Sequence, residues 1–316
     1  MWVQSPALAG PRGPRAKAKP SLTRRREAIA CVLFIAPAVF GFLAFAVVPL
    51  CASAGLSLTD YDLARWPRWV GLDNYRTLLS DPLWWQAVRV TFTYAAIAVP
   101  LWLVNSLALA LVLNQNLRGI PIFRTVYYLP ATLSGVAVAM LWIWLLNYRA
   151  GLVNGALGLI GIKGPNWLGD KRWALFSIIV MSQWSIGWYL PIWLGALQGV
   201  PSELYEAVSI DGGGLWARLR HVTLPMLSPL ILYNLVMNVI WATQVFTEAL
   251  LMTGGGPQWA TLTYMLYLYR NAFSYSKLGL ASAMAWLLFG FILVLTVIVF
   301  RSSPLWVYYE SERRRA

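Results

Sequence analysis

The residues best suited to chemistry lie in one short stretch, from Glu203 to Leu227, which reads ELYEAVSIDGGGLWARLRHVTLPML. It holds three acids, two arginines, the only histidine of the chain and three consecutive glycines, whereas its flanks are almost entirely apolar. Carboxylates and guanidinium groups recognise partners through charge-assisted hydrogen bonds. Because no serine and acid accompany His221 in a catalytic set, we interpret the stretch as a recognition surface and not as an active site.

The local pattern of this stretch predicts two short helices separated by a turn. Pro201 suits the first helical position, and Glu203 suits the first turn, where the helix dipole favours an acid. Residues 212–214 then break the helix, because glycine tolerates positive φ. A second short helix, LWARLRHV, follows, and Pro225 and Pro229 open the next apolar segment. Two interpretations stay open: an interfacial loop shaped by lipid headgroups, or a rigid plug for a groove in a partner protein.

A second set of polar residues follows in the apolar segment from about Leu227 to Leu251. At 100° per residue, a group of them falls within about a third of the helix circumference. The group consists of Asn234, Asn238, Trp241, Gln244 and Glu248. Amides and a carboxylate hydrogen-bond sugar hydroxyls and an indole packs against sugar C–H groups, so this stripe predicts a substrate pathway. Contacts between membrane helices of two subunits are the alternative. We interpret a smaller set, Gln183, Trp184, Ser185 and Trp188, mainly as packing.

The sequence lacks the motifs of a catalytic or energy-converting protein. It has no G-x-x-x-x-G-K-[ST] phosphate loop, and the glycine-rich TGGGPQ contains no lysine. Cys31 and Cys51 lie too far apart on one helix to form a disulfide, and we expect both thiols to be buried. With a single histidine, a zinc site is not expected either. We therefore expect no catalytic residues, no metal and no cofactor in this chain, and any ATP must be bound by a partner.

Both polar regions are embedded in a strongly apolar chain. Of its 316 residues, 59% are hydrophobic and 12% are charged, whereas soluble domains carry about 25% charged residues. A bilayer is the simplest surrounding for such a chain, and a spanning helix needs about 20 apolar residues. Six segments qualify: 29–56, about 90–113, 128–146, 173–197, about 227–251 and 281–300. The fold class is therefore an all-α integral membrane protein with about six transmembrane helices, several of them kinked by proline.

Basic residues predict the orientation of these spans. Residues 1–27 carry seven Lys and Arg, and six spans place both termini on one side of the membrane. That side holds fifteen of the 25 Lys and Arg, and such an excess marks the cytoplasm. We expect both termini and the loop 203–225, between spans four and five, to be cytoplasmic. The expected organisation is a disordered leader over 1–27, a membrane domain over 28–301 and a tail over 302–316. Topology accounts for the charge of the leader, so no nucleic acid is expected as a partner.

The charged stretch resembles the EAA loop of permease subunits of binding-protein-dependent ABC importers. The family pattern of Glu-Ala-Ala, Asp-Gly-Ala and Leu-Pro is matched by Glu206-Ala207-Val208, Asp211-Gly212-Gly213 and Leu224-Pro225. Val208 and Gly213 replace the usual alanines, and Val208 is expected to crowd the docking face slightly. The segments WVGLDNYRTLL, YYLPATLSGVAVAMLWIWLLNYRAGLVN, LMTGGGPQWATLT and SPLWVYYE look like the carbohydrate-uptake branch, to which maltose and glycerol-phosphate permeases belong. The resemblance covers nearly everything after about residue 28.

The resemblance implies a type I importer permease in the bacterial inner membrane that forms half of a sugar pathway. It also implies a second, similar permease subunit, two ATPase subunits and an extracytoplasmic sugar-binding protein. The EAA loop would dock into an ATPase subunit through Glu203, Glu206, Ala207, Asp211, Gly212 and Pro225. The alternative is a secondary transporter of a small polar solute, which would need coupling charges at mid-membrane. The spans carry almost no such charge, which argues against this alternative, although Glu248 leaves it open. The sugar stays unnamed, and a polyol or glycerol-phosphate is compatible with the same motifs.

Overall fold

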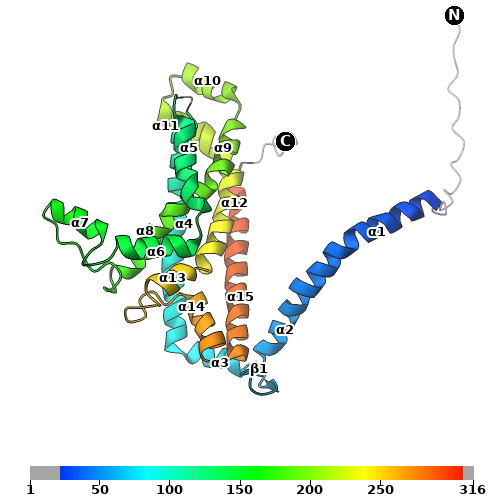
Figure 1. Cartoon of the computed structure of the whole chain (residues 1–316). Coiled ribbons are helices and arrows are strands. Elements are labelled where there is room, and N and C mark those ends of the chain that lie inside the picture. The colour runs from blue at the N-terminus through cyan, green and yellow to red at the C-terminus, as the bar shows by residue number, and fades with distance from the viewer. Residues whose placement is uncertain (1–21, 116, 309–316) are drawn as a thin grey trace, which may run out of the picture. The chain divides into compact units, whose positions relative to one another are not determined.

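The computed structural model describes residues 22–115 and 117–308, and the chain divides into two compact units, residues 1–53 and 54–316 (Figure 1). The predicted leader lies largely outside the described residues, but helix α1 (Leu22–Phe42) already begins within its last residues. A π-helical turn, η1 (Leu43–Val47), joins α1 to α2 (Val48–Ser57). The π turn lies just before Pro49, and such a turn absorbs the backbone disturbance that a proline causes.

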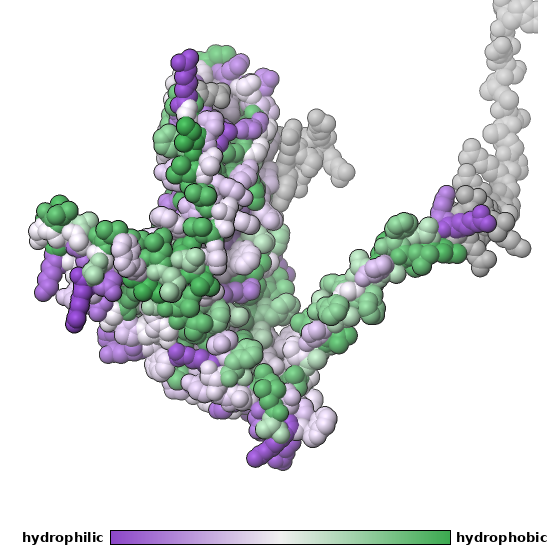
Figure 2. Space-filling model, viewed as in Figure 1, coloured by the Kyte–Doolittle hydropathy of each residue, from purple (hydrophilic) through white to green (hydrophobic). Residues whose placement is uncertain are grey.

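Residues 29–57 form the first candidate span, as predicted. None of its most apolar 18-residue window is buried. Cys31 and Cys51 are therefore exposed free thiols, and the expectation that they are buried is wrong for this chain by itself. The physical reason is that the described residues of unit 1 form one continuous helix, with no second element inside that unit to cover its side chains. Hydrophobic side chains likewise dominate large parts of the visible surface (Figure 2).

Three long helices form the frame of unit 2: α4 (Pro82–Leu113), α12 (Leu224–Thr243) and α15 (Leu278–Ser302). Helix α12 packs against both of the others, and the three run side by side in Figure 1. The sequence predicted a start for α4 near Val90, but the helix begins earlier. Asp81 accepts a hydrogen bond from the Leu83 N–H at 2.9 Å, and Pro82 occupies the first turn. Both are helix-start signals, and they extend the helix beyond its apolar part.

The third predicted span is not one continuous helix. The predicted segment 128–146 begins at the last residue of α5 (Ile120–Tyr128) and continues through a 3-10 turn, η2 (Leu129–Thr132), into α6 (Gly135–Leu145). The parts before and after the break differ in direction by 99°. Pro130 lies in the 3-10 turn and Leu133 is extended, so the helical hydrogen bonds cannot continue into α6. The described residues therefore contain five helices able to span a membrane, or six if this bent pair counts as one span.

The fourth span is helical from 174 to 198, close to the prediction, but it changes type in the middle. Helix α8 (Ala174–Ser182) passes into a 3-10 segment, η3 (Gln183–Tyr189), and then into α9 (Leu190–Gln198). The 3-10 segment passes close to α5. A Cβ atom on Gly187 would lie 1.9 Å from the Tyr127 carbonyl oxygen, so only glycine fits there.

The charged stretch begins with α10 (Ser202–Ile210) and continues with α11 (Leu215–Arg218). Pro201 lies at the N-cap, one position before the expected one. The sequence predicted a second short helix separate from span five, and this prediction is wrong. Helix α11 runs through the π turn η4 (Leu219–Thr223) directly into α12, because the Leu224 N–H reaches back to the Leu219 carbonyl and accommodates Pro225.

Short elements complete unit 2. Beyond α12 lie α13 (Thr247–Met252), α14 (Tyr264–Tyr269), the π turn η5 (Arg270–Ser274) and the 3-10 turn η6 (Ser303–Leu305). Helices α3 (Asp73–Ser80) and α7 (Leu152–Leu159) lie in loops. The strands β1 (Thr59–Asp60) and β2 (Arg68–Trp69) pair antiparallel, Thr59 with Trp69. Helices otherwise make up the described fold, as the all-α prediction requires.

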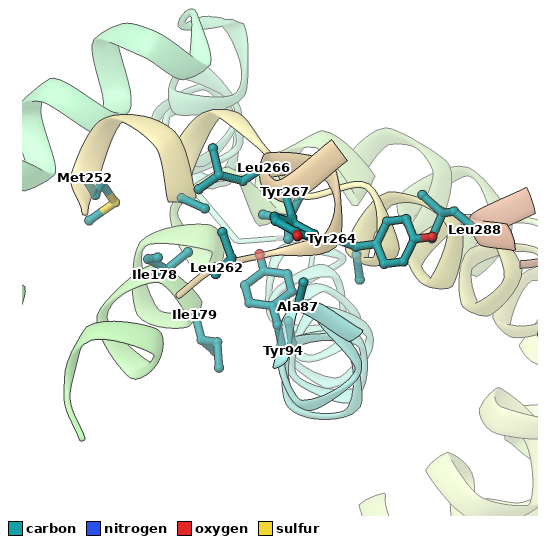
Figure 3. Packing of buried hydrophobic residues seen from close by; sticks show 14 of the residues in the cluster. Ala87, Tyr94, Ile178, Ile179, Met252, Leu262, Tyr264, Leu266, Tyr267 and Leu288 are labelled. Atoms are coloured by element: carbon teal, nitrogen blue, oxygen red, sulfur yellow. The ribbon is translucent and has the colours of Figure 1, made fainter. Parts of the chain in front are cut away.

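Two buried clusters hold the helices of unit 2 together. The larger gathers Tyr94 of α4, Ile178 of α8, Leu262 and Leu266, whose side chains come together in Figure 3. The smaller joins the end of α4 to α9 and the start of α12 through residues such as Trp193.

Tyr267 of α14 donates a hydrogen bond to Asp81, and burial raises the pKa of the Tyr267 phenol to about 12. The phenol is therefore protonated at neutral pH and can act as this donor.

Candidate functional site

A cavity of about 410 Å³ lies inside unit 2, between α4, α6, α8, η3 and α12. Cavities of several hundred Å³ lined by aromatic side chains and a few polar groups are typical of small-molecule sites. Three interrupted helices meet around it. Gly135 and Val138 follow the bend between η2 and α6, Ser185 and Trp188 belong to the 3-10 segment, and residues 244–248 follow the end of α12. In transporters, helix breaks at membrane depth mark the place where a substrate binds.

Aromatic side chains form much of the cavity wall. The wall includes Tyr94, Trp102, Trp188, Tyr189, Tyr233, Trp241 and Phe246. The Trp102 indole is held in place by a 3.0 Å hydrogen bond to the Ser182 hydroxyl and by an edge contact with Tyr94, with ring centroids 6.1 Å apart. Trp188 and Trp241 are 60% and 62% exposed, so their ring faces are free to stack. Fixed and free aromatic faces together suit the C–H faces of a sugar ring.

Polar side chains without partners project from the same wall. Within the described part of the chain, Ser185, Gln244, Thr247 and Glu248 make no side-chain hydrogen bond or ion pair. Asn234 is the most telling member, since it is 1% exposed and both its amide nitrogen and its amide oxygen lack a partner. A buried amide left unsatisfied costs roughly 1–3 kcal/mol. Such a group in a cavity wall is poised to bind something that enters the cavity.

The residues of the predicted polar stripe do not lie on one face of a single helix. Helix α12 ends at Thr243, and Gln244 has φ −106° and ψ 14°, so the 100° rotation per residue stops there. Trp241, Gln244 and Glu248 nevertheless line the cavity, because the chain turns around it after the break. Asn238 is 1% exposed, its amide oxygen has no partner, and it does not belong to the cavity lining.

The smaller predicted set divides between the cavity and the packing. Ser185 and Trp188 line the cavity. Gln183 accepts a 3.0 Å hydrogen bond from Asn105 of α4, and Trp184 packs edge-on against Trp142 with centroids 5.9 Å apart. The sequence interpretation missed lining residues on several helices, and the clearest of them are Tyr94 and Trp102 of α4 and Gly135 of α6. The LPATLSG sequence before α6, with its proline and glycine, was the available signal of a break at membrane depth.

The loop 203–225 contains most of α10 and all of α11, and it lies at one end of unit 2, far from β1 and α14 (Figure 1). Its turn is a Schellman motif. The Gly213 N–H bonds the Val208 carbonyl at 2.8 Å, the Gly212 N–H bonds the Ser209 carbonyl at 3.1 Å, and Gly212 has φ +76°. Of the three glycines, only Gly212 adopts positive φ. The predicted glycine turn is therefore confirmed at Gly212.

Side chains fasten the two helices of the loop to each other. Arg218 donates a 2.7 Å hydrogen bond to the Ser209 hydroxyl, and Tyr205 and Thr223 pair through their hydroxyls at 3.2 Å. The carboxylates and Ala207 point outward instead. Glu203, Glu206, Ala207, Asp211 and Gly212 are all exposed, and Pro225 is half-buried at the base of the hairpin. In the described part of the chain, none of the three acids forms an ion pair. The loop is a hairpin, held by these hydrogen bonds, that displays unpaired acids.

Comparison with known proteins places this arrangement in a family. Residues 106–308 match the family described as binding-protein-dependent transport system inner membrane component. The chain belongs to this family. Among relatives of this transport component, a probable ABC transporter permease protein, YesP of Bacillus subtilis (strain 168), is 41% identical over 93% of this chain and 96% of its own. The trehalose/maltose transport system permease protein MalF of Thermococcus litoralis is 32% identical over 88% of this chain and 95% of its own.

Solved structures agree with the fold. A bacterial ABC transporter involved in the import of the acidic polysaccharide alginate superposes with a TM-score of 0.78. The alignment covers 89% of this transport component and 96% of that chain at 24% identity, so it supports the fold alone. The resemblance derived from the loop is confirmed by the family, and the relatives are transport permeases. Among the described residues, no group of three metal-binding side chains lies together.

Proposed function

We propose that this chain is the permease subunit of an ATP-driven sugar importer and forms half of its translocation pathway. The observation that carries the proposal is the meeting of three interrupted helices around an aromatic cavity that contains the unpartnered Asn234. Relatives named as trehalose/maltose and lactose permeases support sugar as the substrate class. In this proposal Trp241, Gln244 and Glu248 contact the substrate, Asn234 joins them, and Asn238 supports them from the layer behind.

We further propose that the loop 203–225 couples this pathway to a separate ATPase subunit. Glu203, Glu206, Ala207, Asp211 and Gly212 form the docking face, and Pro225 shapes its base. The continuous helix supports this role, since the backbone runs without a break from Leu215 to Thr243. The loop occupies one end of this helix, and Trp241 of the cavity lies near the other. A displacement of the loop would thus reach the cavity through one rigid element.

The same proposal assigns the partners and the location. A second, similar permease would complete the pathway, two ATPase subunits would bind ATP, and an extracytoplasmic binding protein would deliver the sugar. The chain would lie in the bacterial inner membrane with both termini in the cytoplasm. One contact supports this orientation for the C-terminus. The Tyr308 N–H donates a 2.7 Å hydrogen bond to the Ser228 hydroxyl, so the chain after α15 lies at the same end of unit 2 as the loop.

The competing function is a secondary transporter of a small polar solute. Such a protein would import its substrate without an ATPase and would use mid-membrane charges for ion coupling. Membership of a family of binding-protein-dependent transport components favours the ATP-driven importer. Glu248 is the residue on which the alternative would depend.

Reconstitution tests the proposal directly. The chain, its second permease and the ATPase subunits are purified as one complex, placed in proteoliposomes and supplied with the binding protein and a panel of oligosaccharides. We expect uptake of at least one sugar that requires both ATP and the binding protein. Uptake driven by an ion gradient in the absence of ATP would overturn the proposal in favour of the secondary transporter. Absence of any co-purifying ATPase would overturn the coupling role of the loop.

A further inference from the structure

The cavity carries a single charged side chain among its described lining residues, and that charge is negative. Among the described residues that line it, Glu248 is the only acid, and there is no lysine, arginine or histidine. The other polar groups of the wall are neutral hydroxyls and amides. A carboxylate in a partly desolvated cavity disfavours a second negative charge nearby, and no cation among the described lining residues of this chain compensates for it.

Two arginines of unit 2 illustrate how cations are engaged away from the cavity. Arg124 donates two hydrogen bonds to the Leu113 carbonyl, at 3.1 and 2.7 Å. Arg270 donates to the Gly254 carbonyl and lies over the Trp259 ring, 5.2 Å from its centroid. Proteins that recognise carboxylate, sulfonate or phosphate groups usually direct an arginine fork at them. In the described part of this chain, no such fork points into the cavity.

The unpartnered Asn234 further restricts the chemical class of ligand that suits the cavity. Its N–H groups need an acceptor and its carbonyl oxygen needs a donor. A hydroxyl provides both in one group, whereas the oxygens of an ionised acid only accept. A polyhydroxylated, uncharged ligand would therefore satisfy the amide completely, and an anionic group placed there would leave the amide oxygen unsatisfied.

From these observations we infer that the cavity selects uncharged saccharides and excludes anionic ones, and that Glu248 is the determinant of this selection. The inference rests on the proposed sugar-import function and narrows its substrate class. The fold does not decide the matter, because a solved transporter of the same fold is involved in the import of an acidic polysaccharide. Glycerol-phosphate, which the sequence motifs left open, falls on the excluded side.

The first step of the test identifies the charge of the transported sugar. Cells lacking this gene, and the same cells complemented with it, receive a mixture of neutral di- and trisaccharides, their uronic-acid counterparts and glycerol-phosphate. Mass spectrometry follows the depletion of each compound from the medium. We expect depletion that depends on this chain to be confined to neutral sugars. Depletion of an acidic sugar or of glycerol-phosphate would overturn the inference and leave the importer proposal intact. Depletion of no compound would overturn the importer proposal, and the inference with it.

The second step tests Glu248 in the purified complex of both permeases and the ATPase subunits. Calorimetry measures the affinity for the neutral sugar identified in cells and for its uronic-acid counterpart. We expect the complex to prefer the neutral sugar at least tenfold, and we expect Glu248→Gln to reduce that ratio at least threefold. The matched control is Asp73→Asn, which removes an exposed carboxylate, paired with Arg76 at 3.2 Å, from outside the cavity. A ratio that is unchanged in Glu248→Gln, or changed equally in the control, would overturn the role of Glu248.

Discussion

In the loop 203–225 the proposed docking residues are neighbours in sequence, and a few local bonds hold them. The Schellman turn at Gly212 joins residues that are close in sequence, and the hydrogen bond from Arg218 to Ser209 closes a single hairpin. The cavity is built in the opposite way. Its wall joins Tyr94, Gly135, Trp188 and Trp241, which come from four separate helical segments. The proposed coupling surface therefore depends on a locally encoded shape, whereas the proposed substrate site depends on how distant helices pack.

The largest expected effect breaks the cavity through its packing. In Gly187→Val the new side chain would collide with the Tyr127 carbonyl, since even a Cβ atom would lie 1.9 Å from that oxygen. Overpacking of this kind costs about 1–3 kcal/mol or more, and here backbone must move. We expect a lower unfolding temperature of the purified complex and loss of uptake. Gly195→Ala in the same span is the control, because a Cβ there meets nothing within 4 Å. Equal behaviour of the two variants would show that the close approach is unimportant.

The next effect concerns the charge of the loop and leaves the cavity untouched. Glu206 is exposed and unpaired, so Glu206→Lys should insert and fold normally. The reversed charge should weaken binding of the ATPase subunit and reduce uptake strongly, to be measured as ATPase retained on purification and as sugar transported. Asp73→Lys reverses an exposed carboxylate at the other end of unit 2 and should do neither. Normal transport with normal assembly in Glu206→Lys would contradict the docking role.

A smaller effect is expected from the turn of the loop. Gly212 has φ +76°, so Gly212→Val should be strained by about 1–2 kcal/mol. The strain should misorient α11 and impair ATPase docking. Gly214 has φ −79° and open space at its Cβ position, so Gly214→Ala should be nearly neutral. Docking of the ATPase subunit is measured for both variants, and equal, mild effects would argue that the turn is not rigid.

The smallest effect is expected in the cavity itself. Gln244→Leu would remove the proposed side-chain hydrogen bonds to the sugar, worth about 0.5–1.5 kcal/mol each, while the backbone at the end of α12 should stay unchanged. Uptake of the natural sugar should slow, and subunit assembly and nucleotide binding should persist. Gln198→Leu, an exposed glutamine outside the cavity lining, is the control. Loss of the complex in detergent would favour the alternative in which this face joins two subunits. Intact assembly with unchanged uptake would remove Gln244 from both roles.

The sequence by itself determined the membrane class, most of the spans and the loop. A long apolar segment acts through burial in lipid, and a glycine turn acts through backbone freedom. Both effects are local, so each can be recognised from one segment of the sequence. The family resemblance rested on the same local signals, and it is confirmed over residues 106–308. The turn at Gly212 and the outward position of Glu206 also followed from local pattern.

Only the tertiary structure decided where the helices break and what the breaks surround. A periodicity of 100° per residue assumes an unbroken helix, and this assumption failed at Leu133 and again after Thr243. Whether a proline or glycine bends a membrane helix depends on neighbouring helices that satisfy the freed backbone groups, and these neighbours are distant in sequence. For that reason Gln244 and Glu248 line the cavity by a route that the helical pattern did not contain. Tyr94 and Trp102 join them only because α4 packs along α12.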